Sequence, residues 1–213
     1  MTQTLLAIEN LSVGFRHQQT VRTVVNDVSL QIEAGETLAL VGESGSGKSV
    51  TALSILRLLP SPPVEYLSGD IRFHGESLLH ASDQTLRGVR GNKIAMIFQE
   101  PMTSLNPVFT IGNQLDEVTF IHVPGATKES AKNRSLEMLH LVGIADPEHV
   151  YKSFPHELSG GMRQRVMISM ALACNPRLII ADEPTTALDV TIQAQILDLL
   201  RDLKQKMDGS ILL

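Results

Sequence analysis

The sequence has one cysteine, Cys174, among 213 residues, so it can form no internal disulfide, which fits a reducing compartment. It also lacks a run of the roughly 18 to 20 apolar residues that are needed to span a bilayer. The N-terminal stretch MTQTLLAIENLSVGF has no basic segment followed by a long apolar core, and we expect no signal peptide. These absences predict a soluble protein that reaches a membrane only through a partner.

Basic clusters, internal repeats and low-complexity tracts are absent as well. The formal net charge is −5, whereas a nucleic-acid-binding domain usually has a basic face, so we expect no nucleic-acid partner. Local phosphate binding stays compatible with this charge because backbone amides can hold phosphate. With 43% hydrophobic residues, the chain is long enough for one domain, with or without a sizeable insertion.

Expected strands alternate with expected helices along the chain. The strands are Leu5–Ile8, Val28–Ile32, Thr37–Val41, Gly69–Phe73, Ile94–Phe98, Leu178–Ala181 and Ser210–Leu213. The helices are Ser49–Leu59, Gly160–Cys174, Ile192–Lys206 and a helical block within Ile111–Val150. This order predicts an α/β fold with a mainly parallel core sheet, antiparallel strands near the N-terminus and a helical subdomain. Because the chain stops in an apolar strand, we also expect it to be truncated.

The segment GESGSGKS, Gly42–Ser49, matches the phosphate-loop pattern G-x-x-x-x-G-K-[ST] without deviation. It follows an expected strand and opens an expected helix, so its N–H groups can point at β- and γ-phosphates. Lys48 adds positive charge near the γ-phosphate, and the Ser49 hydroxyl can bind Mg²⁺. The alternative is a glycine-rich turn with an incidental lysine. The predicted nucleotide-binding residues of this segment, together with the residue that follows it, are Gly42, Glu43, Ser44, Gly45, Ser46, Gly47, Lys48, Ser49 and Val50.

The segment LIIADEP, Leu178–Pro184, places two acids after a buried-type strand. Ligands bind at the carboxyl edge of such strands in open α/β sheets. Asp182 can hold Mg²⁺ through water, and Glu183 can accept a proton from an attacking water. Acids after a strand are more often a solvated turn or a helix cap, but the phosphate loop favours the catalytic interpretation.

The segment LSGGM opens a second helix with almost no side chains. Ser159 is a good N-cap, and Gly160 and Gly161 follow it, although glycine weakens a helix by about 1 kcal/mol relative to alanine. A bare helix start can bind an anion. The alternative is a flexible start to an ordinary core helix. The sequence alone does not say whether both bare helix starts bind the same nucleotide.

These motifs, with TALD at Thr186–Asp189, occur in the order that is typical of ATP-binding cassette (ABC) ATPases, which the chain resembles over nearly its whole length. The stretches QEPMTSLNP (Gln99–Pro107), FPHELSGGMRQRVMISMAL and ADEPTTALDVTIQAQIL resemble ATPase subunits of bacterial dipeptide and oligopeptide importers. The first hundred residues also resemble the N-terminal cassette of tandem-cassette ATPases in microcin C-type peptide importers.

The resemblance implies an ATP-hydrolysing subunit, with ATP and Mg²⁺ as cofactors, that energises a peptide importer as a transport-coupled translocase. Two cassettes meet head to tail in this family, so Ser159, Gly160 and Gly161 would act on ATP held by a partner cassette. Met162 stands where many members have glutamine. The second cassette would belong to a homodimer, a heterodimer or a tandem chain. The other implied partners are permease subunits and, indirectly, a substrate-binding protein, at the cytoplasmic face of the bacterial inner membrane.

The resemblance also implies roles for single residues. Gln99 would sense Mg²⁺, water and the membrane partner, Asp189 would contact the opposite cassette, and Phe15 would stack on adenine where tyrosine is more usual. The alternative for Phe15 is an ordinary core aromatic. The implied catalytic residues are Lys48, Gln99 and Glu183, and the implied Mg²⁺ ligands are Ser49, Gln99 and Asp182. Residues 1–98 and 177–213 would form the catalytic core, and residues from about 100 to 175 the Gln99 loop, the helical subdomain and the signature helix.

One family feature is missing from the sequence. A histidine is expected just after the strand that follows the Asp189 helix, and none of the seven histidines has that position; His156 is more simply explained as structural. This leaves a fragment that binds nucleotide without hydrolysing it as an alternative. A non-transport ABC ATPase and a phosphate-loop kinase are further alternatives, but the sequence lacks the long basic linkers of the former, and a kinase would not need LSGGM or TALD.

Overall fold

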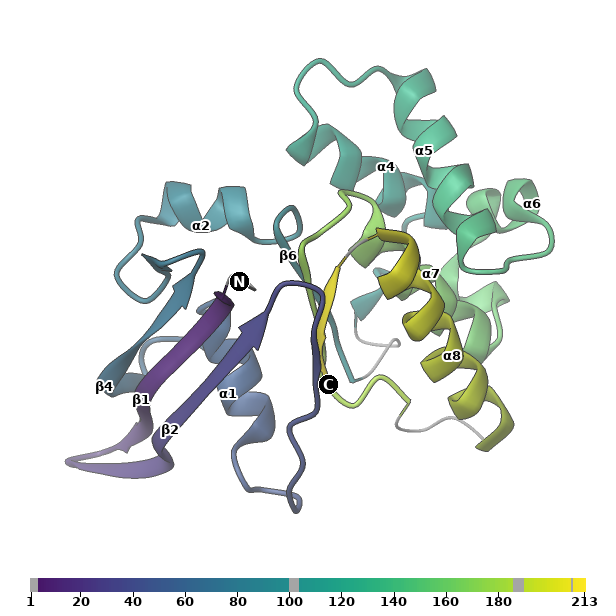
Figure 1. Cartoon of the computed structure of the whole chain (residues 1–213). Coiled ribbons are helices and arrows are strands. Elements are labelled where there is room, and N and C mark those ends of the chain that lie inside the picture. The colour runs from purple at the N-terminus through teal and green to yellow at the C-terminus, as the bar shows by residue number, and fades with distance from the viewer. Residues whose placement is uncertain (1–3, 100–103, 186–189, 208) are drawn as a thin grey trace. The chain divides into compact units, whose positions relative to one another are not determined.

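The computed structural model describes residues 4–99, 104–185, 190–207 and 209–213 of the chain (Figure 1). Two units make up the chain: residues 1–90 with 210–213, and residues 91–209. The expected catalytic core, residues 1–98 with 177–213, and the expected helical part, about 100–175, stay predictions. Strand β6 (Ile94–Ile97) pairs with β7 (Leu178–Ala181), which keeps both strands with the helices of the second unit.

The first unit is built on an antiparallel sheet in the order β2–β1–β4–β5. Its strands are β1 (Thr4–His17), β2 (Thr20–Glu33), β4 (Val64–Phe73) and β5 (Glu76–Ser77). Apolar side chains of β1, β2 and β4 such as Leu6, Ile8, Leu11, Ile32 and Ile71 are fully buried, which follows from the alternation of apolar and polar residues along the strands. The antiparallel N-terminal part that the sequence predicted is thus present, with strands longer than expected.

The first unit also contains the phosphate-loop segment. Strand β3 (Thr37–Leu38) pairs in parallel with β8 (Ser210–Leu212), and the Leu40 N–H donates to the Leu213 carbonyl at 2.7 Å. Helix α1 (Lys48–Ile55) follows the loop, and α2 (Asp83–Val89), which the sequence did not predict, comes after β5. Because the Arg90 guanidinium donates to the carbonyls of Leu56 and Arg57, at 2.8 Å each, α1 ends before the expected Leu59.

The second unit combines the parallel pair β6–β7 with five α-helices and a short 3₁₀ helix in its described residues. The expected helical block consists of α4 (Ile111–His122), α5 (Lys128–Leu141) and α6 (Pro147–Lys152), each begun by a side-chain cap, Thr110, Thr127 and Asp146. These helices group together in Figure 1. The others are η1 (Pro155–Glu157), α7 (Gly160–Leu172) and α8 (Val190–Met207). Helix α7 ends earlier than expected, where the Arg134 Nε donates to the Ala173 carbonyl at 2.9 Å.

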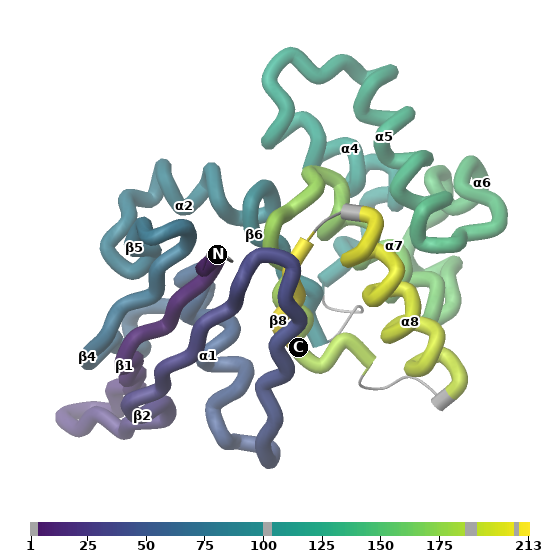
Figure 2. Tube along the Cα trace, viewed as in Figure 1, coloured from purple at the N-terminus to yellow at the C-terminus, as the bar shows by residue number. Residues whose placement is uncertain are grey.

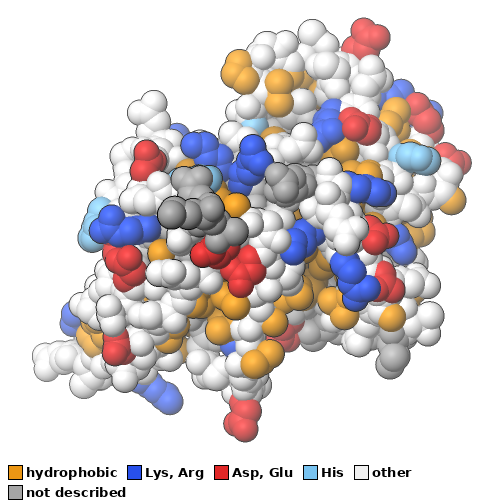
Figure 3. Space-filling view, viewed as in Figure 1, with side chains coloured by type: hydrophobic (Ala, Val, Ile, Leu, Met, Phe, Trp, Pro, Cys, Tyr) orange, Lys and Arg blue, Asp and Glu red, His pale blue; other side chains and the backbone are white. Residues whose placement is uncertain are grey.

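Within the described ranges, no helix combines the length and the apolar character that crossing a bilayer requires. On the face shown in Figure 3, Lys and Arg side chains are interspersed with Asp and Glu side chains.

A partly buried polar cluster joins the three helices α4, α5 and α6. The Asp116 carboxylate of α4 accepts hydrogen bonds from the Ser135 hydroxyl of α5 and the Tyr151 hydroxyl of α6, both at 2.6 Å. Burial, and then the contact with Asp116, raises the pKa of the Tyr151 hydroxyl. The Tyr151 ring lies against Gly112, where an added Cβ would be 2.6 Å from the nearest ring carbons. The tethered ring cannot move away without losing its hydrogen bond.

We therefore expect Gly112→Ala to lower the free energy of unfolding by about 1–3 kcal/mol, because the new methyl group overpacks this contact. The matched change Gly88→Ala in α2 adds a Cβ with nothing within 4 Å, so it should leave stability unchanged or raise it by up to about 1 kcal/mol. Urea unfolding followed by circular dichroism measures both. Equal effects of the two variants would contradict the packing argument.

Candidate functional site

The phosphate loop Gly42–Ser49 has a backbone shape that depends on glycine. Gly45 and Gly47 have φ values of 81° and 93°, which side-chain-bearing residues rarely adopt. A Cβ on Gly47 would lie 3.1 Å from the Val24 carbonyl oxygen and 3.2 Å from Val25 Cγ2, so the loop also runs close to strand β2. Only glycine satisfies both constraints at residue 47.

Lys48 crosses the loop from the first turn of α1. Its Nζ donates hydrogen bonds to the carbonyls of Gly42 at 2.7 Å and Glu43 at 3.0 Å. The ammonium group has three N–H donors, so it can hold the loop and still donate to a phosphate. The first turn of α1 contains no acidic residue, which keeps the positive end of the helix dipole available for an anion.

The rest of α1 anchors this loop. Thr51 is buried, and its hydroxyl donates to the Gly47 carbonyl at 3.0 Å. Ser49 and Val50 are half-buried in the first turn, where a Ser49 hydroxyl is chemically suited to Mg²⁺. The phosphate loop therefore offers backbone N–H groups and one ammonium to phosphates, and one hydroxyl to Mg²⁺. These groups fit a nucleoside triphosphate with Mg²⁺.

The two predicted acids follow strand β7 in the second unit. All four residues of β7 are buried, and the Asp182 N–H extends the β6–β7 ladder by donating to the Ile97 carbonyl at 3.0 Å. Glu183 is exposed and has a φ of 47°, in the left-handed region that costs a non-glycine residue about 1–3 kcal/mol. Such strain persists only where the surrounding structure holds it.

Gln99, which follows β6, contacts the second of these acids. Its Nε2 donates to Glu183 Oε2 at 2.9 Å. The second unit thus brings together two of the three predicted catalytic side chains, whereas Lys48 belongs to the first unit. The same division holds for the predicted Mg²⁺ ligands, because Asp182 and Gln99 are in the second unit and Ser49 is in the first.

Hydroxyl, carboxylate and amide oxygens are ligands that Mg²⁺ accepts, and Mg²⁺ is commonly held by few protein groups together with substrate phosphates. In the part of the chain that the structure describes, no group of three or more His, Cys, Asp or Glu side chains forms a metal site. The Ser49 hydroxyl, the Asp182 carboxylate and the Gln99 amide oxygen are chemically suited to Mg²⁺.

Ser159 begins a helix as its N-cap, as the sequence predicted. Ser159 is the N-cap of α7, and its Oγ accepts a hydrogen bond from the Met162 N–H at 3.3 Å. Ser159 and Gly160 are exposed, and no acidic residue lies in the first turn. A Cβ on Gly161 would lie 3.3 Å from Ile192 Cγ2 of α8, so this glycine also permits close packing of two helices.

Phe15 is half-buried on β1, opposite Arg22 of β2 and Val64 of β4. It is therefore not a fully buried core aromatic. Asp189 lies outside the described residues.

Gln164 is a functional candidate that the sequence analysis missed. This side chain of α7 is 1% exposed, and its Nε2 donates to the Pro184 carbonyl at 2.6 Å. From α8, the Gln193 Nε2 donates to the neighbouring Thr185 carbonyl at 3.2 Å. The helix that begins at Ser159 is thereby tied to the segment that carries Glu183. No local pattern signals this contact, since glutamine in a helix is usually a surface residue.

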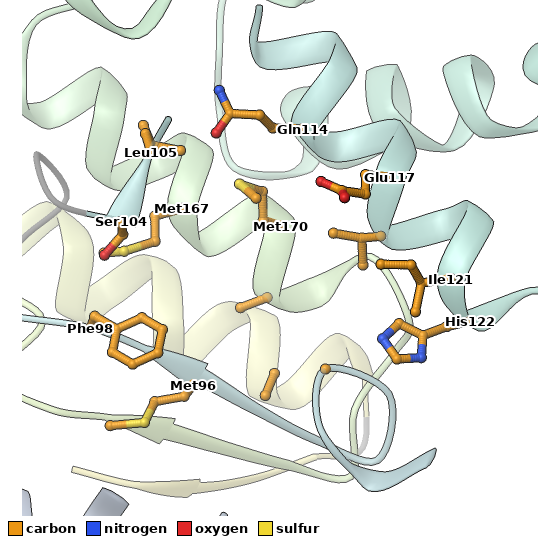
Figure 4. Close-up of a pocket in the computed structure, with 14 residues that line it drawn as sticks. Met96, Phe98, Ser104, Leu105, Gln114, Glu117, Ile121, His122, Met167 and Met170 are labelled. Carbon is orange, nitrogen blue, oxygen red and sulfur yellow. The ribbon is translucent and has the colours of Figure 1, made fainter. Parts of the chain in front are cut away.

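An apolar groove lies in the second unit beside the Gln99 segment (Figure 4). It has a volume of about 250 Å³ and is lined in part by three methionines. Figure 4 shows Met170 near the centre, with Glu117 and His122 of α4 at one side. Burial lowers the pKa of the His122 imidazole. Exposed apolar side chains border it, including Phe98 at 39% and Ile121 at 66% exposure. The methionines are Met96, Met167 and Met170.

A loop next to this groove is held by a buried glutamine, again without a local sequence signal. Gln114 Oε1 accepts from the Asn106 N–H at 2.9 Å, and its Nε2 donates to the carbonyls of Asn106 and Phe109 at 3.0 Å each. The loop presents Val108 and Phe109 with exposed fractions of 71% and 52%. Exposed apolar side chains that form a patch commonly mark a surface where another protein or a membrane binds.

We expect Gln164→Met, which keeps the volume and removes the donor, to lower the free energy of unfolding by about 1–3 kcal/mol, because the buried Pro184 carbonyl loses its partner. The control Gln205→Met changes an exposed residue of α8 and should have no measurable effect. Thermal or urea unfolding measures both. An unchanged unfolding midpoint for Gln164→Met would show that the contact does not stabilise this segment.

The chain is similar to known transporter subunits over its whole length. The ABC transporter family model matches residues 25–186. The "Uncharacterized ABC transporter ATP-binding protein YejF" of Escherichia coli (strain K12) is 74% identical over 212 residues, which cover 100% of this chain and 40% of that protein. The oligopeptide transport ATP-binding protein OppD of Bacillus subtilis (strain 168) is 53% identical over 208 residues, covering 98% of this chain and 58% of that protein. The chain thus spans less than two thirds of the length of these relatives.

The chain is also similar in fold to a solved structure. The dimeric ATP-binding cassette MJ0796, in a post-hydrolysis state bound to ADP and Pi, aligns with a TM-score of 0.85 and 29% identity, covering 98% of this chain and 86% of that chain. The expected α/β cassette fold is confirmed by this likeness. From the family match and these relatives, we conclude that the chain belongs to the ABC transporter family and has the fold of its ATP-binding cassette.

Proposed function

We propose that this chain is the ATP-binding and ATP-hydrolysing cassette of a bacterial peptide importer. The observation that carries the proposal is the phosphate loop, in which Gly45 and Gly47 adopt positive φ values and Lys48 is held across the loop in front of a helix start without acids. The oligopeptide-transport name of the Bacillus subtilis relative supports the transported class.

In this proposal, the phosphate loop binds ATP through its N–H groups and Lys48. Ser49, Asp182 and Gln99 are the residues that would hold Mg²⁺. Bound Mg²⁺ would neutralise part of the phosphate charge. Glu183 accepts a proton from the attacking water, and the hydrogen bond from Gln99 fixes its orientation. The left-handed backbone at Glu183 supports this role, since strained residues cluster at catalytic positions.

The exposed helix start at Ser159, Gly160 and Gly161 serves a second cassette in this proposal. Its N–H groups would bind the γ-phosphate of ATP held by that cassette, as anions bind at helix N-termini. The dimeric state named for MJ0796 supports such an arrangement. Asp189 would contact the same partner. The buried hydrogen bond from Gln164 to the Pro184 carbonyl would then couple a phosphate bound at the start of α7 to the Glu183 segment.

Membrane subunits are the proposed partners of the apolar groove between α4 and α7. Its methionine lining can adapt to an inserted apolar side chain, and the Gln99 segment lies beside it. The cassette would therefore be peripheral to the cytoplasmic face of the inner membrane, with peptide selection left to the permease and a substrate-binding protein.

We expect Glu183→Gln to lower Mg-ATP turnover per chain by at least about 100-fold while ATP binding persists, because a general base contributes this much or more. Lys48→Ala should lose ATP binding, because it removes the phosphate-facing charge. Turnover and nucleotide affinity are measured across a range of protein concentrations, and a rise with concentration is expected if a second cassette completes the site.

The control Glu129→Gln makes the same chemical change at an exposed position of α5 and should not alter turnover. Parent-level turnover by Glu183→Gln would refute the general-base role. Nucleotide binding without turnover by the parent chain would limit the proposal to binding, and unchanged binding by Lys48→Ala would refute the nucleotide site itself.

A further inference from the structure

A second pocket lies in the second unit where α4, α5 and the end of α7 meet, three helices that contact one another (Figure 2). It has a volume of about 310 Å³, far more than one water molecule needs. Thr119 and Val123 line it from α4 and are one turn apart. The groove beside Gln99 is lined by other residues of α4, including Glu117 and Ile121, so the two sites lie on different faces of this helix.

Arg134 of α5 is the charged group of this pocket. Its Nε donates to the Ala173 carbonyl at 2.9 Å and its Nη2 donates to Asn175 Oδ1 at 2.7 Å, which ties the guanidinium to the end of α7. Nη1 has two N–H groups and donates to Glu137 Oε2 at 2.9 Å. One N–H of Nη1 is therefore left without an acceptor among the residues that the structure describes.

The contact between Arg134 and Glu137 is one that a ligand can compete with. Glu137 lies three residues further along α5, and its side chain is 64% exposed, whereas that of Arg134 is 21% exposed. Ion pairs of this spacing with an exposed partner contribute little to stability, because water screens them. A carboxylate inside the pocket would be less screened, so it could accept the remaining N–H and compete with Glu137.

Thr119 is a second polar position in the wall of the pocket. The residue is 4% exposed, and its Oγ1 has no hydrogen-bond partner among the described residues. Buried hydroxyls in native structures nearly always have a partner, because leaving one unpaired costs free energy. An oxygen of a bound ligand would supply the missing acceptor.

The rest of the wall is neutral and partly apolar. Val123 and Ala173 line it with aliphatic groups, and Cys174 lines it with a thiol. Burial raises the pKa of the Cys174 thiol, although the charge of Arg134 opposes this shift. A neutral thiol does not repel an anion, so one cation and a short apolar wall together suit a carboxylate with an aliphatic chain.

We propose that this pocket binds a small aliphatic carboxylate, whose oxygens accept hydrogen bonds from Arg134 Nη1 and the Thr119 hydroxyl. The pocket contains no residue of the phosphate loop, the Gln99 segment or the helix start at Ser159. The inference therefore goes beyond the proposed function and does not rest on it.

The alkylation of Cys174 reports on this pocket, since it is the only cysteine of the 213-residue chain. The experiment measures the alkylation rate by mass spectrometry, with iodoacetamide as the reagent and butyrate as the probe ligand. The controls are butyramide, which has nearly the same shape without the charge, and sodium chloride at equal ionic strength. We expect butyrate to slow the alkylation in a saturable manner and both controls to leave the rate unchanged.

A second readout compares two reagents. Iodoacetate and iodoacetamide both react with the thiolate, so the ratio of their rates does not depend on the thiol pKa. We expect this ratio to be at least about fivefold higher for Cys174 than for N-acetylcysteine amide, because Arg134 would hold the carboxylate of iodoacetate by a charge-assisted hydrogen bond.

Three variants assign the contacts. Arg134→Met should abolish protection by butyrate and lower the ratio to that of the free thiol. Thr119→Val should weaken butyrate binding without lowering the melting temperature, since it removes a buried hydroxyl that has no partner. Glu137→Gln removes the competing carboxylate and should tighten butyrate binding. Because it leaves Arg134 and the end of α7 intact, it keeps the test decisive even if Arg134→Met fails to fold.

The matched control is Asp198→Asn in α8. It removes a carboxylate from Arg201, three residues along the helix at 3.1 Å, and should not alter butyrate binding. Equal slowing by butyrate and butyramide would overturn the inference, because the pocket would then bind the aliphatic chain alone. Absence of slowing by butyrate would overturn it too, as would unchanged or weaker butyrate binding by Glu137→Gln.

Discussion

The close approach of Gly47 to strand β2 is the contact on which the proposed nucleotide site depends. The positive φ of Gly47 lets the chain turn from the loop into α1, and its missing side chain lets Val24 and Val25 lie against the loop. The first effect directs the loop amides and Lys48 toward an anion. The second lets strand β2 pack against the loop. Gly47 thus both shapes the loop and positions it against the hairpin.

In the second unit, the residues proposed to be catalytic are connected by hydrogen bonds between segments far apart in sequence. Gln99 reaches Glu183 across 84 residues, and Gln164 reaches Pro184 from the interior of α7. The Glu183 backbone has a positive φ, and these contacts hold both its carboxylate and the residue that follows it. The helix that begins at Ser159 is joined to the Glu183 segment through the hydrogen bond from Gln164 to the Pro184 carbonyl.

Local sequence predicted those features that depend on local geometry. The phosphate loop, the buried strand β7 and the N-cap at Ser159 were all found from residue pattern, because glycine, apolar runs and capping hydroxyls act within a few residues. Errors occurred where tertiary contacts override local preference. Helix α1 ends earlier than expected, where Arg90 donates to the carbonyls of Leu56 and Arg57 just beyond it.

The sequence by itself determined the chemistry of this protein: the donors of the phosphate loop, the acids after a buried strand and the bare helix start. These properties follow from residue types at short spacing. Tertiary structure alone decided which of them meet, since the partners of Glu183, Pro184 and Asn106 are Gln99, Gln164 and Gln114, three glutamines with no distinguishing local pattern. It also decided that Arg22 lies beside Phe15, because strand register depends on packing along both strands.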